Sequence, residues 1–282
     1  MKVGVFTVCL PDLTPEEAVR EIAAAGYEGV EWRVARVPEE VRGQEPSFWE
    51  NNLCTLEPTR EEVRRACSLC EGAGLEIAGL GTYIGVGDLD AVDEAMNLAR
   101  VAGAPQIRVG SGSLEGATYA QRFEEARRFL MGVEELAGQH GVKALVEIHH
   151  GTICPSASLA HRLVSGFDSD AIGVTYDPGN MAFEGFEEYR IGTELLGPYL
   201  AHVHLKNAAF DRLENGGAWR PRWAPPVDGV VDSERLFEAL RVAGYDGWLV
   251  IEDFSATRPT REALRHNLGY VRDLVQRLPA RS

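Results

Sequence analysis

Short apolar runs alternate with amphipathic segments along the whole chain. A short apolar run bounded by turn signals is typical of a strand buried on both faces, and apolar residues three and four positions apart indicate a helix that packs by one face. Eight apolar runs are present, and a segment with helical periodicity follows each of them. The expected strands are residues 3–8, 27–33, 75–81, 106–110, 142–149, 172–177, 201–206 and 248–253. The expected helices are residues 15–26, 60–74, 88–103, 117–141, 156–167, 186–196, 233–244 and 261–278.

Local capping signals support the first two helices. Thr14 precedes Pro15 and stands three residues before Glu17, a spacing typical of a capped helix start with proline in the first turn. Thr59 and Glu62 repeat the three-residue spacing. Gly26 and Gly74 follow the last periodic positions, so we expect them to end these helices.

Strands that alternate with helices predict right-handed crossovers and a parallel sheet. Eight such units in about 250 residues is the size of a (β/α)8 barrel, so we expect one TIM barrel domain over residues 1–282. A doubly wound open sheet is the alternative. Its best cue is a glycine-rich fingerprint after the first strand, and Val8-Cys9-Leu10-Pro11 is not one. Residues 34–58 and 207–232 are two long segments without a clear pattern.

The charge balance limits the classes of partner. Formal net charge is −15 and the sequence pI is about 5.0, so the chain as a whole does not attract nucleic acid or an anionic membrane. We see no signal peptide and no apolar stretch long enough to cross a bilayer, and we expect a cytoplasmic protein. The five cysteines are odd in number and scattered, which argues against a disulfide framework.

Acids and imidazoles gather where the last four strands end. The active site of such a barrel lies at the C-terminal ends of its strands. Those ends carry four candidate ligands, Glu147, Asp177, His204 and Glu252. Three neighbouring carboxylates raise one another's pKa unless a cation lies among them. Three oxygen donors with one nitrogen suit Mn²⁺, Mg²⁺ or Co²⁺ better than a structural Zn²⁺. We therefore expect one divalent metal ion (Mn, Mg, Co or Zn), with Mn favoured.

The histidine ligand has an alternative two residues earlier. His202 and His204 face the same side of a strand, because side chains alternate along it. His204 lies nearer the C-terminal rim, so we prefer it, and we expect His202 one layer deeper. Arg108, His149 and Lys206 are candidate substrate contacts at neighbouring strand ends. An apolar wall for a sugar could come from the tryptophans Trp32, Trp219 and Trp223.

Five motifs carry a resemblance to a known superfamily. They are L-V-E-I-H-H-G, V-T-Y-D-P-G-N, H-V-H-L-K-N, W-A-P-P-V-D-G-V-V-D and G-Y-D-G-W-L-V-I-E. With them, nearly the whole chain resembles the xylose-isomerase-like barrels of sugar phosphate isomerases and epimerases, which include ketose 3-epimerases, hydroxypyruvate isomerase and inosose dehydratase.

The resemblance implies roles for the ligand set. In the ketose 3-epimerases a Glu, Asp, His and Glu bind one divalent metal, and these fall on Glu147, Asp177, His204 and Glu252. The two glutamates, Glu147 and Glu252, are then also the acid/base pair. This chain departs from the epimerase pattern in two places. Asn180 stands where they commonly carry a histidine, and Lys206 or Arg212 stands near their arginine; we assign Asn180 to substrate binding with Lys206.

The leading functional prediction is a metal-dependent isomerase or epimerase of a small sugar, ketose or related polyhydroxy carbonyl compound. It would move a proton next to a metal-bound carbonyl. The alternative is a dehydratase or lyase acting on a cyclic polyol ketone. A DNA-repair endonuclease is disfavoured by the seven histidines and the net charge of −15, and a non-catalytic sugar-binding barrel remains open. The expected partner is a small sugar-like molecule, with no nucleic acid and no membrane, and a homo-oligomer is possible.

Overall fold

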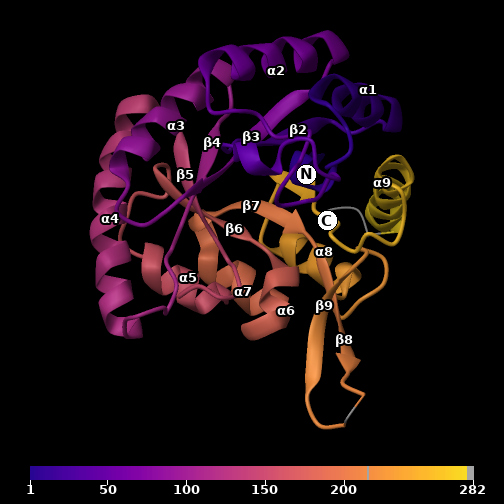
Figure 1. Cartoon of the computed structure of the whole chain (residues 1–282). Coiled ribbons are helices and arrows are strands. Elements are labelled where there is room, and N and C mark those ends of the chain that lie inside the picture. Colours follow the sequence, from indigo (N-terminus) through magenta and orange to yellow (C-terminus); the bar gives the residue numbers. More distant parts are fainter. Residues whose placement is uncertain (215, 278–282) are drawn as a thin grey trace.

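The computed structural model describes residues 1–214 and 216–277. Eight parallel strands close into a barrel in the order β1-β10-β7-β6-β5-β4-β3-β2 (Figure 1). The barrel strands are β1 (Lys2–Phe6), β2 (Gly29–Arg33), β3 (Glu76–Ile84), β4 (Gln106–Val109), β5 (Lys143–Glu147), β6 (Ile172–Tyr176), β7 (Leu200–Leu205) and β10 (Trp248–Ile251). The predicted (β/α)8 barrel is therefore confirmed.

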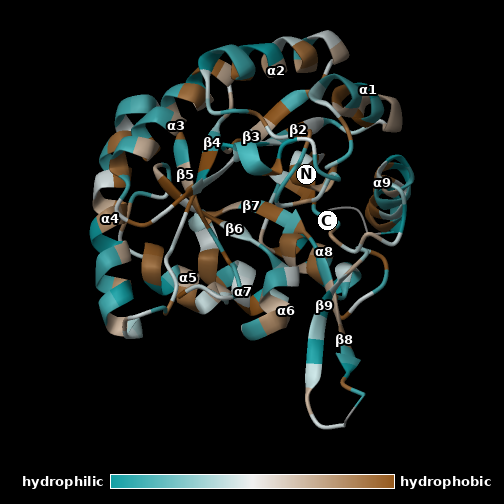
Figure 2. Ribbon diagram, viewed as in Figure 1, coloured by the Kyte–Doolittle hydropathy of each residue, from teal (hydrophilic) through white to brown (hydrophobic). Residues whose placement is uncertain are grey.

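Helices surround the barrel with their apolar faces turned inward (Figure 2). They are α1 (Pro15–Ala25), α2 (Arg60–Ala73), α3 (Leu89–Ala102), α4 (Tyr119–His140), α5 (Ala157–Val164), α6 (Pro178–Glu184), α7 (Tyr189–Leu196), α8 (Ser233–Val242) and α9 (Thr260–Arg277). Residue 278, the expected end of the last helix, lies outside the described residues. Among the helices that the structure describes, none is both long and apolar enough to cross a membrane.

The capping signals at the first helix act as the sequence indicates. The Thr14 side chain accepts a hydrogen bond from the Glu17 backbone N–H, and the Glu17 carboxylate accepts one from the Thr14 backbone N–H. Gly26 follows with a φ of 95°, a left-handed conformation that glycine adopts without strain. Thr59 likewise accepts from the Glu62 backbone N–H.

Residues 207–232, expected to be irregular, contain an antiparallel hairpin. Its strands β8 (Asn207–Arg212) and β9 (Trp219–Ala224) project from the barrel (Figure 1). Pro221 lies inside β9 opposite Phe210. A proline in the sequence argues against a strand. A two-stranded sheet has only edge strands, and proline is tolerated there.

The segment after β6 also differs from expectation. One helix was predicted over residues 186–196, and the structure has two, α6 and α7. The Asp177 side chain accepts a hydrogen bond from the Asn180 backbone N–H and caps α6. Aspartate before proline fits a helix start as well as a turn, so the sequence leaves both possible.

Gly81 in β3 lets Phe6 pack close to the strand ends. A Cβ at this position would overlap the Phe6 ring, and that ring packs against His204 with centroids 5.8 Å apart. We expect Gly81→Ala to lower the free energy of unfolding by about 1–3 kcal/mol through overpacking. The matched control is Gly138→Ala within α4, where a Cβ meets nothing within 4 Å. It should raise stability by about 0.5–1 kcal/mol, because alanine is the better helix former. Urea unfolding of both variants tests the prediction, and a stable Gly81→Ala protein would contradict it.

Candidate metal centre

The four predicted ligands meet at one end of the barrel. Glu147 is the last residue of β5, His204 lies near the end of β7, and Asp177 and Glu252 directly follow β6 and β10. One donor atom from each residue lies within 4.8 Å of the donor atoms of the other three. All four side chains are buried, because parallel strands end on the same side of the barrel. We call these four side chains the floor of the site.

The His204 ring faces the three carboxylates through Nδ1. This atom lies 3.2 Å from Glu147 Oε1, 3.5 Å from Glu252 Oε2 and 3.9 Å from Asp177 Oδ2. Burial lowers the pKa of His204, but neighbouring carboxylates, led by Glu252 and Glu31, outweigh it and hold that pKa well above its ordinary value. The floor is thus strongly anionic and favours a positive charge at its centre.

Two organic cations flank the carboxylates. Arg108 Nη1 lies 2.6 Å from Glu147 Oε2, and its guanidinium stacks over the Tyr83 ring with its central carbon 4.2 Å from the centroid. Burial raises the pKa of Glu147, but Arg108 together with His204 and His149 outweighs this, and the pKa lies well below the usual range. Glu147 is therefore held as a carboxylate.

Lys206 is the second cation, and it is buried. Its Nζ lies 2.9 Å from Asp177 Oδ2 and contacts Glu252 Oε2. The same atom lies 5.1 Å from the ring centroids of both Trp223 and Phe254, so two aromatic faces border the ammonium. Burial raises the pKa of Asp177 to about 6, with Lys206 opposing the rise.

Asn180 lies beneath the floor. Its Nδ2 donates to Asp177 Oδ2 at 2.8 Å and to Glu147 Oε1 at 3.3 Å, and its Oδ1 lies 3.0 Å from His150 Nδ1. The side chain is fully buried and orients two carboxylates. Its predicted contact with substrate stays a prediction.

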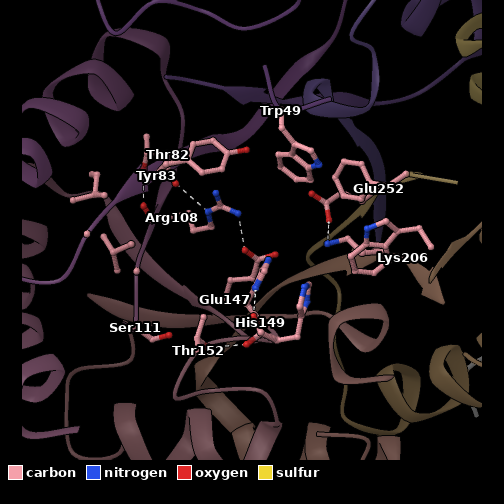
Figure 3. A pocket seen from close by; sticks show the side chains of 17 residues that line it. Trp49, Thr82, Tyr83, Arg108, Ser111, Glu147, His149, Thr152, Lys206 and Glu252 are labelled. Atoms are coloured by element: carbon pink, nitrogen blue, oxygen red, sulfur yellow. Dashed lines mark hydrogen bonds and ion pairs between the residues drawn. The ribbon is translucent and has the colours of Figure 1, made fainter. Parts of the chain in front are cut away.

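A cavity of about 530 Å³ opens above the carboxylates (Figure 3). Its wall includes Arg108, Glu147, His149, Lys206 and Glu252. Further polar lining comes from His150, Ser111 and Thr152, and aromatic lining from Trp49, Tyr83, Trp223 and Phe254. The volume and the mixture of aromatic and polar groups suit a small polar molecule with an apolar face.

The three tryptophans that were candidates for the apolar wall lie in different environments. Trp223, carried by the hairpin, lines the cavity. Trp32 is fully buried in the core, and Trp219 is largely exposed on the hairpin. Trp49, in the irregular segment 34–58, takes a place on the wall that the sequence did not indicate, because no periodicity orients that segment.

The donor set fits a divalent cation. Three carboxylates and one imidazole converge, and Glu252 Oε2 is buried without a hydrogen-bond partner among the described residues, although Lys206 contacts it. Such an atom is costly unless it is bound to a charge. Oxygen-rich ligation with one nitrogen suits Mn²⁺, Mg²⁺ or Co²⁺, and Zn²⁺ also accepts carboxylate with imidazole.

Glu31, the middle residue of β2, was not assigned to the centre from sequence. It is buried, and its Oε2 lies 3.0 Å from His204 Nε2 and 2.8 Å from His202 Nε2. Burial raises the pKa of Glu31, but the two imidazoles outweigh it and the pKa falls well below its usual range. An acidic side chain within a fully buried strand was the available signal. His202 lies one layer below His204, as strand alternation predicts.

The chain matches one family model and several characterised proteins. A model described as xylose isomerase-like TIM barrel matches residues 19–274. The inosose dehydratase of Geobacillus thermodenitrificans is 29% identical over 154 residues, 49% of this chain and 50% of that one. The chain thus spans about half the length of the first curated relatives it matches. The inosose dehydratase of Clostridium botulinum is 24% identical over 291 residues, 91% of this chain and 90% of that one.

Solved structures share the fold at lower identity. The IOLI protein, solved with a bound zinc atom, superposes with a TM-score of 0.78 at 14% identity, covering 100% of both chains. The 3-keto-D-glucoside 4-epimerase YcjR from E. coli gives a TM-score of 0.72 at 17% identity, covering 97% of this chain and 99% of that one. At these identities the likeness describes the fold.

Proposed function

Because the chain belongs to the xylose isomerase-like TIM barrel family, we propose that it is a divalent-metal-dependent dehydratase acting on a cyclic polyol ketone. The relatives named inosose dehydratase support this reaction class, and one of them aligns over nearly the whole chain. The zinc atom bound by the IOLI protein, which shares the fold, supports a metal in this barrel. Glu147, Asp177, His204 and Glu252 are the proposed ligands, with Mn²⁺ as the expected ion.

The choice of dehydration over epimerisation rests on the unequal surroundings of Glu147 and Glu252. Both Glu147 oxygens are engaged, Oε2 by Arg108 and Oε1 by His204 and Asn180. Glu252 Oε2 contacts Lys206 and lies 3.5 Å from His204 Nδ1, but it has no hydrogen-bond partner among the described residues. Epimerisation by two bases needs a proton-accepting group on each face of the carbon, whereas elimination needs one base. Carboxylates with contrasting surroundings are suited to different roles, so we assign the base role to Glu252.

The remaining groups have roles that follow from their contacts. A divalent ion bound here would polarise the substrate carbonyl and acidify the carbon beside it. Glu252 Oε2 then removes the proton from that carbon. Lys206, with its ammonium fixed between two aromatic faces, donates a hydrogen bond to a substrate oxygen. The departing hydroxyl also needs a proton.

Two imidazoles on the cavity wall can carry that proton. His149 Nδ1 lies 2.6 Å from the backbone carbonyl oxygen of His150, so Nδ1 is the donor of the His149 ring. His150 Nδ1 faces Asn180 Oδ1, a second acceptor. In both rings Nε2 is therefore the atom left to take and return a proton, and we assign this step to the pair.

An isomerase or epimerase, the leading prediction from sequence, remains the competing function. It uses the same proton abstraction and requires Glu147 to act as the second acid/base group. The fold is compatible with it, since the YcjR epimerase shares the barrel. The engagement of Glu147 by Arg108 disfavours it, because a carboxylate held ionised is a weak base.

One assay separates these functions. The chelator-treated protein is reloaded with Mn²⁺ and incubated with cyclic polyol ketones and with ketoses in D₂O. We expect a product lighter by one water from a cyclic polyol ketone, no turnover without metal, and recovery on addition of Mn²⁺. Parallel samples with Mg²⁺, Co²⁺ and Zn²⁺ rank the metals. Deuterium incorporation without loss of water would favour the epimerase. Metal and ligand binding without any chemistry would favour a binding barrel, and either outcome overturns the dehydratase.

A further inference from the structure

A buried series of hydrogen bonds leads from His204 away from the cavity. His204 Nε2 lies 3.0 Å from Glu31 Oε2, which also lies 2.8 Å from His202 Nε2. His202 Nδ1 in turn lies 2.7 Å from Gln106 Nε2. All four side chains are more than nine-tenths buried, and they come from β2, β4 and β7. None of the four lines the cavity.

The chemistry of the end members fixes the direction of every bond in the series. The amide nitrogen of Gln106 only donates, so His202 Nδ1 accepts and His202 carries its proton on Nε2. The Glu31 carboxylate only accepts, so it receives N–H groups from the Nε2 atoms of both His202 and His204. The proton on His204 Nε2 is therefore fixed, and Nδ1, the atom that faces the three carboxylates of the floor, is the ring nitrogen that a metal can bind.

We propose that Glu31 is the positioning residue that sets the tautomer and the ring orientation of His204 for metal binding. A histidine ligand whose second nitrogen donates to a carboxylate is held in one tautomer and is a stronger donor. His202 and Gln106 hold Glu31 in turn, since without them the buried carboxylate has one N–H fewer. The inference rests on the proposed metal site and adds a residue outside the four-ligand set.

Metal affinity provides the first test. Mn²⁺ affinity is measured by chelator competition for the wild type and for Glu31→Gln. We expect the variant to bind about 10–100-fold more weakly, the usual effect of removing such a partner. The matched control is Asp93→Asn, which alters another histidine–carboxylate pair, with Asp93 Oδ1 2.7 Å from His140 Nε2. The control should bind like the wild type. A folded Glu31→Gln protein with wild-type affinity would overturn the inference.

The tautomer itself provides the second test and needs no stable Glu31 variant. Long-range ¹H–¹⁵N spectra of the wild type loaded with diamagnetic Zn²⁺ report which ring nitrogen of His204 is protonated, with the signal assigned by its loss in His204→Gln. We expect a proton on Nε2 and the metal on Nδ1. A proton on Nδ1 would overturn the inference.

The two proposals fail in different ways. A wild-type protein that binds no divalent metal contradicts the proposed function. The metal-free spectrum then still tests Glu31, because His204 protonated only on Nδ1 excludes the hydrogen bond from Nε2. A wild type that binds metal while Glu31→Gln binds equally well contradicts the positioning role alone.

Discussion

Replacing Glu252 with glutamine should lower the turnover of the metal-loaded protein by about 10³-fold, within the range that a positioned general base contributes. Glu252 Oε2 lies buried at the cavity floor, in contact with Lys206 and 3.5 Å from His204 Nδ1, and it has no hydrogen-bond partner among the described residues. Glutamine keeps the shape and one oxygen donor but does not accept a proton at neutral pH. The fold and much of the metal binding should therefore survive.

The metal content of the Glu252→Gln variant separates the role of Glu252 as a metal ligand from its role as a general base. Turnover is measured at saturating Mn²⁺, and bound metal is quantified in the same sample. Glu238→Gln is the control, because Glu238 pairs with Arg241 on the outer surface of α8. It should leave turnover unchanged. A Glu252→Gln protein that binds Mn²⁺ and retains a tenth or more of wild-type turnover would show that another group removes the proton.

Replacing Lys206 with methionine should make the stability of the protein depend on metal. In chelator we expect the free energy of unfolding to fall by roughly 3–5 kcal/mol, because removing one partner of a buried ion pair leaves its carboxylates uncompensated. Lys206 is 3% exposed and serves both Asp177 and Glu252, so no solvent replaces it. With saturating Mn²⁺ the two carboxylates regain a cation, and most of the loss should disappear.

Urea unfolding with and without Mn²⁺ measures this dependence. The control is Lys2→Met, since the Lys2–Glu76 pair has a similar N–O distance of 2.6 Å but is about half exposed. An exposed pair contributes about 1 kcal/mol at most, with or without metal. Equal losses for Lys206→Met in chelator and in Mn²⁺ would show that the ammonium and the metal do not share the same carboxylates.

The barrel could be predicted because its signals are local. Each strand is an apolar run and each helix has its own periodicity, so eight units follow from eight separate observations. The boundaries are less certain. The fifth strand was expected to reach residue 149 and ends at Glu147, which places His149 and His150 in the loop that follows. The hairpin was missed because Pro221 opposes a strand prediction unless the strand is known to be an edge.

The ligand set could be predicted because parallel strands end on the same rim. A residue at the end of one barrel strand therefore lies near residues at the ends of others, whatever their separation in sequence. The contact between Glu31 and His204 could not be predicted from this rule alone. Glu31 meets His204 across the barrel interior, 173 residues away, and that contact depends on which face of β2 points inward. The contacts of Lys206 are similarly non-local, because its partners Asp177 and Glu252 follow two other strands.

The hairpin has a consequence for how such an enzyme can diversify. Lys206 immediately precedes β8, and Trp223, opposite Ala208, lies in β9 on the cavity wall. Trp49 reaches the same wall from the irregular segment after β2. The four ligands, in contrast, belong to barrel strands or directly follow them. The proposed metal ligands and the tryptophans of the cavity wall are thus encoded in different stretches of the chain. Insertions or register changes in the hairpin or in residues 34–58 can reshape the cavity wall for a new molecule, while the ligand residues at the strand ends stay unchanged.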